Sequence, residues 1–496
     1  MNDVTPRVNK PNLPGPAPSE SSQGRSRWLW YLIAGGLLVI LIAILLPRKH
    51  DSSTAAVVSG NAQRPGAAAN SPTADRARPV SRQSGSAVAP ALTAEEIVAG
   101  KLAQFARSRR DLAHALARRH GVAVSDDVER FFDAVESGNW TEIEARFKVI
   151  EGGDSSAGQA AGRPPDVQHL WPAIIDAYGV ADQVHEWPAQ KLLDYGNAIL
   201  DSLRPGMVYV GGTDNGRWIP ELLNDTSEGE RHVVVTQNGL ADGTYLDYLS
   251  VLYSDRLSTL TEEDSSRAFQ EYIADAQKRF QHDQQFPDEP KQVRPGEDIK
   301  MEDGRVQVSG QVAVMSINEK LLQALMQKNP DLSFALQESF PLKGTYAEAD
   351  PLGPLMELHT QDGQNTFTAD RAAQSLDYWR TTTQNVLADP EASGSTAALK
   401  SYSHDATSAA NLLAAHGYSA EAEQAYRLSS QLWPGNPEPI GGLAEILFRT
   451  GRADEAQRLL DEFVRKNPDQ RSAMETVRAS ITFTKPATPQ DQTPRP

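Results

Sequence analysis

The longest apolar stretch of the chain lies near its N-terminus. Residues 28–46, from Trp28 to Leu46, read WLWYLIAGGLLVILIAILL and contain no charged residue. At about 1.5 Å per residue, a helix of this length matches a bilayer core of about 30 Å. The sequence therefore predicts a single transmembrane helix through which the chain meets a membrane. The alternatives are a cleaved signal peptide, whose apolar core is shorter, and a buried helix of a soluble domain.

Basic residues flank this apolar run on both sides. Arg25 and Arg27 precede it, and Arg48 and Lys49 follow it. The positive-inside rule therefore hardly distinguishes the two possible orientations of the helix in the membrane. We favour an extracytoplasmic, periplasmic location for the body, because an anchor so near the N-terminus often leaves only a short tail inside.

Three segments lack an apolar pattern. They are rich in proline, alanine, serine and glycine, and so cannot bury enough apolar surface to offset the entropy lost on ordering. We expect disordered tails at 1–27 and 482–496 and a disordered linker at 47–92.

Apolar residues recur at helical spacing in the next part of the chain. Thr93 and Glu96 have the spacing of a capping box before a long helix. Two later helices are expected at about 167–179 and 188–203. The pattern predicts an α-helical domain over 93–203.

The pattern changes to short runs of β-branched residues in the middle of the chain. Apolar runs at 207–210 and 233–236 are each followed by a polar loop, with a short helical segment between them. Strand, helix and strand at this spacing predict a βαβ unit with parallel strands. Further elements are expected as follows: a helix at 264–282, a hairpin turn at Asp303-Gly304, a helix at 318–328, and strands at 333–338 and 355–360. We predict an α/β domain over 204–365 with a mostly parallel, Rossmann-like sheet.

A repeat with a period of 34 residues marks the C-terminal part. The matched positions are Ala410 with Ala444, Leu413 with Leu447, Gly417 with Gly451, Ala422 with Ala456, Tyr426 with Leu460, and Pro434 with Pro468. This is the tetratricopeptide period and residue pattern. The alternative is coincidence in an alanine-rich helical stretch. We predict repeats at about 403–436 and 437–470 in an all-α domain over 366–481.

Two repeats are fewer than the three that a free-standing array needs. We therefore expect them to pack on another element, and the helix at 370–388 is the nearest candidate. The helices around Gly138 have similar helix-turn-helix spacing, so 93–203 is a candidate for a degenerate repeat.

Composition removes several classes of function. The formal net charge is −17, which disfavours nucleic-acid binding because phosphate backbones are repelled. The chain has no cysteine, which excludes disulfides, cysteine-ligated zinc and thiol catalysis. The ten histidines show no metal-ligand spacing. We expect no cofactor, no metal and no catalytic residue.

The loops after the two predicted strands are the candidate ligand site. Ligands of open parallel sheets bind outside the carboxyl ends of strands. The first loop, GGTDNGR at 211–217, lacks both the dinucleotide-binding and the P-loop spacing. Glu338 and Ser339, at the end of the predicted strand 333–338, would line the same crevice. The alternative is that the polar residues of these loops only cap the following helices. The candidate ligand-binding residues are Thr213, Asp214, Asn215, Arg217, Gln237, Asn238 and Asp242.

The chain from about 200 to 480 resembles a group of uncharacterised bacterial tetratricopeptide-repeat proteins with one membrane anchor. The resemblance rests on YVGGTDNGRWIPELL, TQNGLADGTYLDYL and GRVQVSGQVAVMSIN. The GGTDNGR loop is also similar, more weakly, to a loop in the soluble region of membrane proteins related to protein O-mannosyltransferases. Those proteins have many spans, so the similarity implies no transferase activity here and suggests at most ligand binding by Asp214 and Asn215.

Two functions fit these observations. The first is a membrane-anchored scaffold or assembly factor of the cell envelope that binds a protein or peptide partner through its repeats and its α/β domain. The second is an enzyme or accessory subunit of envelope glycan or glycosyl-transfer metabolism, with a ligand crevice at 211–217 and 236–242. The sequence favours the non-enzymatic scaffold.

Overall fold

The computed structural model describes residues 92–152, 165–294, 296–302, 305–359 and 367–483, all of which belong to one compact unit, Ala91–Pro496. The predicted transmembrane run, the tail before it and almost all of the predicted linker and C-terminal tail lie outside these residues. Among the helices that the structure describes, none combines the length and apolar character that a membrane span requires.

The N-terminal part is helical, as predicted. Its helices are α2 (Ala94–His120), α3 (Asp126–Ser137), α4 (Trp140–Glu151), α5 (Pro165–Glu186) and α6 (Ala189–Leu200). The predicted capping box is present: Glu96 N donates to Thr93 Oγ1 at 3.2 Å, and Thr93 N donates to Glu96 Oε2 at 2.8 Å. These two bonds satisfy backbone amides that a helix start leaves unpaired.

Helix α5 was predicted to end at 179 and instead continues to Glu186. Gly179 does not stop the helix, because its role is to permit close packing. A Cβ atom at this position would lie 2.1 Å from Cε2 of Trp218 in the next layer. The glycine thus lets the Trp218 ring rest directly on the α5 backbone.

A five-stranded sheet forms the centre of the middle part. Its strands are β1 (Val208–Gly211), β2 (Val233–Thr236), β5 (Phe334–Leu336), β6 (Ala349–Leu352) and β7 (Leu355–Leu358). Their order is β2-β1-β5-β7-β6, with parallel β2-β1 and β1-β5 pairs and antiparallel β5-β7 and β7-β6 pairs.

The predicted βαβ unit is confirmed, whereas the mostly parallel, Rossmann-like sheet is wrong for half of the strand pairs. Strand β6 was not predicted. It contains Pro351, lies at the sheet edge and joins β7 by a tight turn at Gly353, whose φ is 58°. A tight turn connects antiparallel neighbours only, so this hairpin makes the sheet mixed.

Helices cover the sheet and one hairpin stands apart from it. These elements are α7 (Asn215–Asp225), α8 (Gly243–Leu252), α9 (Glu262–Gln285), β3 (Asp298–Glu302), β4 (Arg305–Ser309), α10 (Gln311–Lys328) and the 3₁₀ turn η1 (Tyr346–Glu348). The hairpin strands β3 and β4 pair as predicted, although the turn at 303–304 lies outside the described residues. Helix α10 begins seven residues before the predicted start at 318.

Tyrosines from α8 and its C-terminal cap cover the free edge of β2. Val234 N donates to the Tyr253 hydroxyl at 3.1 Å, and Thr236 N donates to the Tyr245 hydroxyl at 2.7 Å. These amides have no strand on that side to pair with. The tyrosines therefore satisfy an edge that would otherwise be open to pairing with another chain.

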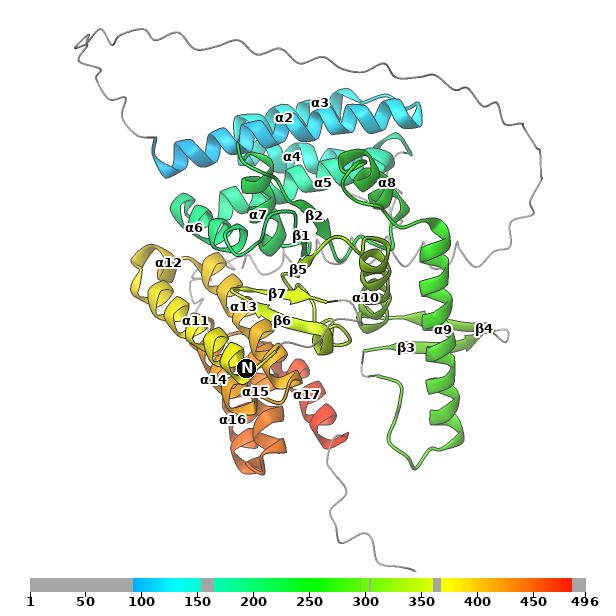
Figure 1. The fold of residues 1–496 in the computed structure, drawn as a ribbon, viewed down its shortest axis with the longest axis vertical. Helices are drawn as coiled ribbons and strands as arrows, with labels where there is room; N and C mark the ends of the chain where they lie inside the picture. Colours follow the sequence, from blue (N-terminus) through cyan, green and yellow to red (C-terminus); the bar gives the residue numbers. More distant parts are fainter. Residues whose placement is uncertain (1–91, 153–164, 295, 303–304, 360–366, 484–496) are drawn as a thin grey trace, which may run out of the picture. The chain divides into compact units, whose positions relative to one another are not determined.

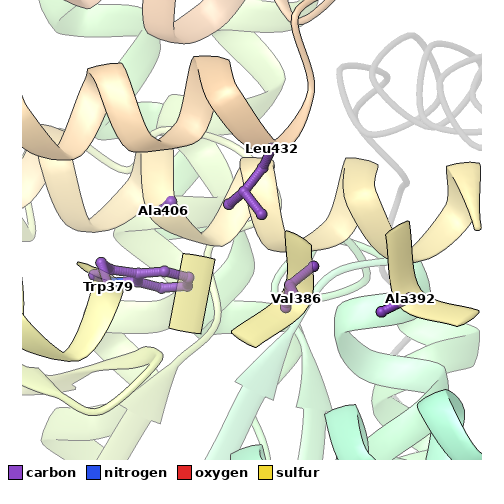
Figure 2. Close-up of a cluster of buried hydrophobic side chains, with 5 residues drawn as sticks. All are labelled: Trp379, Val386, Ala392, Ala406 and Leu432. Carbon is purple, nitrogen blue, oxygen red and sulfur yellow. The ribbon is translucent and has the colours of Figure 1, made fainter. Parts of the chain in front are cut away.

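The C-terminal part is helical, as predicted. Its elements are α11 (Ala369–Ala388), α12 (Pro390–Gly394), α13 (Thr396–Ala415), α14 (Ser419–Leu432), α15 (Pro437–Arg449), α16 (Ala453–Lys466), the 3₁₀ turn η2 (Pro468–Gln470) and α17 (Arg471–Phe483). Helix α11 packs on α13 and α14. Figure 2 shows the shared core, formed by Trp379, Val386, Ala392, Ala406 and Leu432 from four different helices.

The two repeats have the same local geometry. Gly417 and Gly451 follow the first helix of each repeat with φ of 82° and 80°, in the left-handed region that favours glycine. Ala422 and Ala456 are buried, as are Tyr426 and Leu460 at the next matched position.

Each repeat ends in a proline, and helix α17 follows the second repeat. Pro434 and Pro468 both follow the second helix of their repeat and are exposed. Helix α17 continues the period, since buried Met474 and Ile481 lie 34 residues after Ile440 and Leu447. Helix α15 packs on α13 and also on α17, so α17 serves as the terminal cap of the array.

Candidate functional site

The loops after β1 and β2 lie side by side, as their parallel pairing predicts. Asn238 Nδ2 donates to Thr213 Oγ1 at 3.1 Å, and Gln237 N donates to Gly211 O at 2.8 Å. The side chain of Gln237 is fully buried, and neither of its polar atoms has a hydrogen-bond partner among the described residues. The two loops therefore close on each other through a direct side-chain contact.

Two of the candidate carboxylates cap helices. Asp214 precedes α7, and its Oδ1 accepts from Gly216 N at 3.1 Å. Asp242 precedes α8, and its Oδ1 accepts from the Thr244 amide at 2.9 Å and the Thr244 hydroxyl at 2.7 Å. These bonds satisfy the first amides of each helix, which is the structural alternative that the sequence left open.

Arg217 points away from the loop rim into the protein. Its Nε donates to Gly212 O at 2.7 Å, its Nη2 to Asp176 Oδ1 at 2.9 Å, and its Nη1 to Glu221. Only 2% of the residue is exposed. Its guanidinium is thus engaged inside the fold.

Arg109 joins the same buried network from α2. Its Nη2 lies 2.7 Å from Glu221 Oε1 and 2.6 Å from Asp225 Oδ2, and its side chain is wholly buried. Burial raises the pKa of Glu221, although the two arginines oppose that rise. These ion pairs fasten the N-terminal helices to α7, and their location favours a structural role.

The topological switch of the sheet lies between β1 and β5. The chain passes from β1 to β2 on one side and returns to β5 on the other side of β1. Ligands of open sheets bind at such a point. Here the chain itself fills the space: a Cβ atom on Gly212 would lie 2.1 Å from Cβ of Ser339, and one on Gly216 would lie 2.2 Å from Gln337.

Helix α13 covers this end of the sheet. It runs beside β6 and β7 (Figure 1). Asn215 Nδ2 donates to the hydroxyl of Ser401, and Gln337 Nε2 donates to Asp405 Oδ1 at 2.7 Å. Asp405 also accepts from the Tyr195 hydroxyl at 2.8 Å, and burial raises the pKa of Asp405 to about 6. The first repeat is therefore joined to the sheet by buried polar contacts.

The loop after β5, residues 338–348, rests against the same helix. We call it the plug loop. Nε2 of His404 lies 2.6 Å from Glu338 O, and Nε2 of His416 lies 2.6 Å from Tyr346 O. The sequence pattern gives neither histidine a role, since no histidines stand at metal-ligand spacing. The 34-residue period is the one sequence feature that could have drawn attention to His404. It places His404 and Glu438 at equivalent repeat positions, and the two side chains form a pair at 3.3 Å.

Two cavities of the described residues differ in size and enclosure. A closed cavity of about 10 Å³, lined in part by Glu338, Asp405 and Ser408, has room for about one water. A depression of about 660 Å³ near Arg119 and Lys328 is open to the surface. The described part of the chain also holds no cluster of three or more metal-ligating side chains.

The comparisons with known proteins concern the repeats alone. Residues 407–481 match the family model described as tetratricopeptide repeat. No curated protein and no solved structure matches the chain. The match begins within α13, covers α14 to α16 and ends within α17. It supports the predicted repeats, whereas no match supports the resemblance to O-mannosyltransferase-related proteins or to membrane-anchored proteins.

Proposed function

We propose that this protein is a membrane-anchored interaction scaffold or assembly factor of the bacterial cell envelope. In this account the repeats bind a protein partner, and the α/β domain holds the repeats in place. The observation that carries the proposal is the tetratricopeptide match over 407–481, since such repeats generally mediate protein–protein interaction. Stacked helical repeats present extended surfaces that suit this work.

The candidate loop residues support this reading over an enzyme. Asp214 and Asp242 cap helices, Arg217 lies in a buried ion network, and Asn215 contacts the first repeat. These side chains already have structural partners. A ligand would have to compete with those contacts.

A row of residues on α15 is the proposed partner surface. Its members, which we call the second row, are Glu438, Gly442, Glu445 and Arg449. The charged side chains of this row are 50%, 39% and 59% exposed in that order. Glu438, Gly442 and Glu445 stand 34 residues after α13 positions that contact the loop after β5.

Charge exchange within the second row tests the proposal. Glu445 and Arg449 form an i,i+4 ion pair of 2.6 Å, so the double variant Glu445→Lys with Arg449→Glu keeps the net charge and the helix. We expect the partners that co-purify with the full-length, membrane-extracted protein to fall at least tenfold. Quantitative mass spectrometry of the purified complexes measures the loss.

A matched pair on α16 provides the control. Glu462 and Lys466 form an i,i+4 ion pair of 2.8 Å on a similarly exposed helix. The exchange Glu462→Lys with Lys466→Glu should leave the partners unchanged. If both exchanges retain every partner, the repeats do not bind through the second row and the proposal fails. Deleting residues 400–470 is a poorer test, because it removes α13 from the sheet.

A further inference from the structure

The plug loop is held by side chains of the repeat that contact its main chain. His404 and His416 lie twelve residues apart on or next to α13, and each approaches one loop carbonyl, that of Glu338 or Tyr346, at 2.6 Å. The Glu438 carboxylate on the other side of His404 helps to keep that imidazole positioned. Two further α13 side chains, Ser408 and Asn411, interact with the side chains of Glu338 and Tyr346.

The loop is also closed on itself. Oε1 of Glu338 accepts from Leu342 N at 2.8 Å and from the Tyr346 hydroxyl at 2.6 Å. Leu342 and Tyr346 are buried, whereas Lys343 and Gly344 at the tip are exposed. The loop thus has its own internal bonds and presents one carboxylate and one tyrosine hydroxyl to α13, while the Gly344 and Thr345 amides bond to Glu319 on α10.

The loop occupies one repeat and stops at the boundary of the next. The α13 positions that it contacts include His404, Ser408 and Asn411, which we call the first row. Their equivalents 34 residues later are Glu438, Gly442 and Glu445, of which Glu438 is exposed and Glu445 is partly exposed. The same face therefore contacts the chain's own loop in the first repeat, whereas in the second repeat no part of that loop contacts Glu445 or Arg449 among the hydrogen bonds and ion pairs of the described residues.

We propose that the plug loop is an internal ligand of the first repeat and blocks the first row against partners. A partner that displaces it presents the same chemistry, a loop with a carboxylate and a tyrosine hydroxyl, to the first row. This inference rests on the proposed function, because blocking has meaning only if the repeats bind partners. Displacement of the plug loop would begin at its exposed tip, Lys343.

Binding of the loop in trans tests the proposal. The probe is a fluorescent synthetic peptide of residues 338–348. In the full-length protein with residues 338–347 replaced by glycine and serine, we expect saturable binding seen by fluorescence anisotropy. The unaltered protein should bind at least tenfold more weakly, because its own loop fills the first row. Adding His404→Ala to the replaced protein should abolish binding.

A second variant covers the case in which the replaced protein does not fold, as judged by circular dichroism. His404→Ala with His416→Ala leaves the loop in place but removes both contacts to its carbonyls. Trypsin cleavage after Lys343, followed by mass spectrometry, should become at least tenfold faster than in the unaltered protein.

Either of two results overturns the proposal: a folded replacement variant that ignores the peptide, or an unchanged cleavage rate at Lys343 in the double-histidine variant. Neither measurement needs a natural partner. Failure here is therefore distinct from failure of the second-row exchange, which tests the proposed function itself.

Discussion

Glu338 is the residue at which β5, the plug loop and α13 meet. Burial raises the pKa of Glu338 from 4.5 to about 7, against the effect of the Tyr346 hydrogen bond. The folded state thus binds this proton more tightly than the unfolded state does. Stability from this group is complete below pH about 4.5 and is lost as the pH rises to about 7.

Glu338→Gln should remove this pH dependence. We expect the free energy of unfolding of the unaltered protein to fall relative to the variant by roughly 1–3 kcal/mol between pH 4.5 and 7.5. Urea denaturation followed by circular dichroism measures the difference. Glu475→Gln, an exposed change on α17, serves as the control, and an equal difference at both pH values would show that Glu338 does not titrate in this window.

Arg109 is the other residue whose burial has a large energetic consequence. It faces Glu221 and Asp225 from α2, with its side chain wholly buried. Arg109→Met should cost about 3–5 kcal/mol, because it leaves Asp225 without its cation and Glu221 with Arg217 alone. Denaturation midpoints of this variant and of Arg118→Met, an exposed arginine on the same helix, would be compared. Equal midpoints for the two variants would mean that the network contributes no stability.

At the scale of single elements, the sequence predicts best where the signal is local. The Thr93 capping box and the glycines after the repeat helices act within a few residues of themselves, and the structure has them as expected. Strand β6 and the continuation of α5 past Gly179 were missed. Both depend on partners distant in sequence, namely β7 and Trp218.

The repeat glycines give an element-scale prediction. Gly417→Ala and Gly451→Ala should each destabilise by about 1–2 kcal/mol, because a Cβ atom is strained at φ near 80° although nothing crowds it. Gly394→Ala, equally uncrowded but without a positive φ, should change stability by less than about 0.5 kcal/mol. Thermal unfolding of the three variants measures these changes in stability. A Gly394 effect as large as the others would remove the repeat-specific explanation.

At the scale of the whole molecule, the candidate site was predicted only in part. Parallel pairing of β1 and β2 made the contact between Thr213 and Asn238 foreseeable. The covering of the β5 end by α13 was not, because Gln337 and Asp405 are 68 residues apart and no local pattern links them. The role of His404 was hidden in the same way, because His404 and Glu338 are 66 residues apart in the sequence.

The anchor is a whole-molecule prediction that rests on residues 28–46 of the sequence. We expect the full chain to stay in the membrane fraction after carbonate washing, and a chain lacking residues 1–46 to be released into the soluble fraction. Fractionation and immunoblotting measure both. An intact full chain in the soluble fraction would contradict the predicted membrane anchor.

Site-specific photo-crosslinking in intact cells tests the central claim most directly. A photoreactive amino acid at position 445 of the second row should give discrete adducts of higher mass, whereas the same residue at position 462 on α16 should give none. Such a result would place a protein partner beside Glu445 in the second row. Absence of adducts at 445, or equal adducts at both positions, would contradict the account of this protein as a scaffold that binds through its repeats.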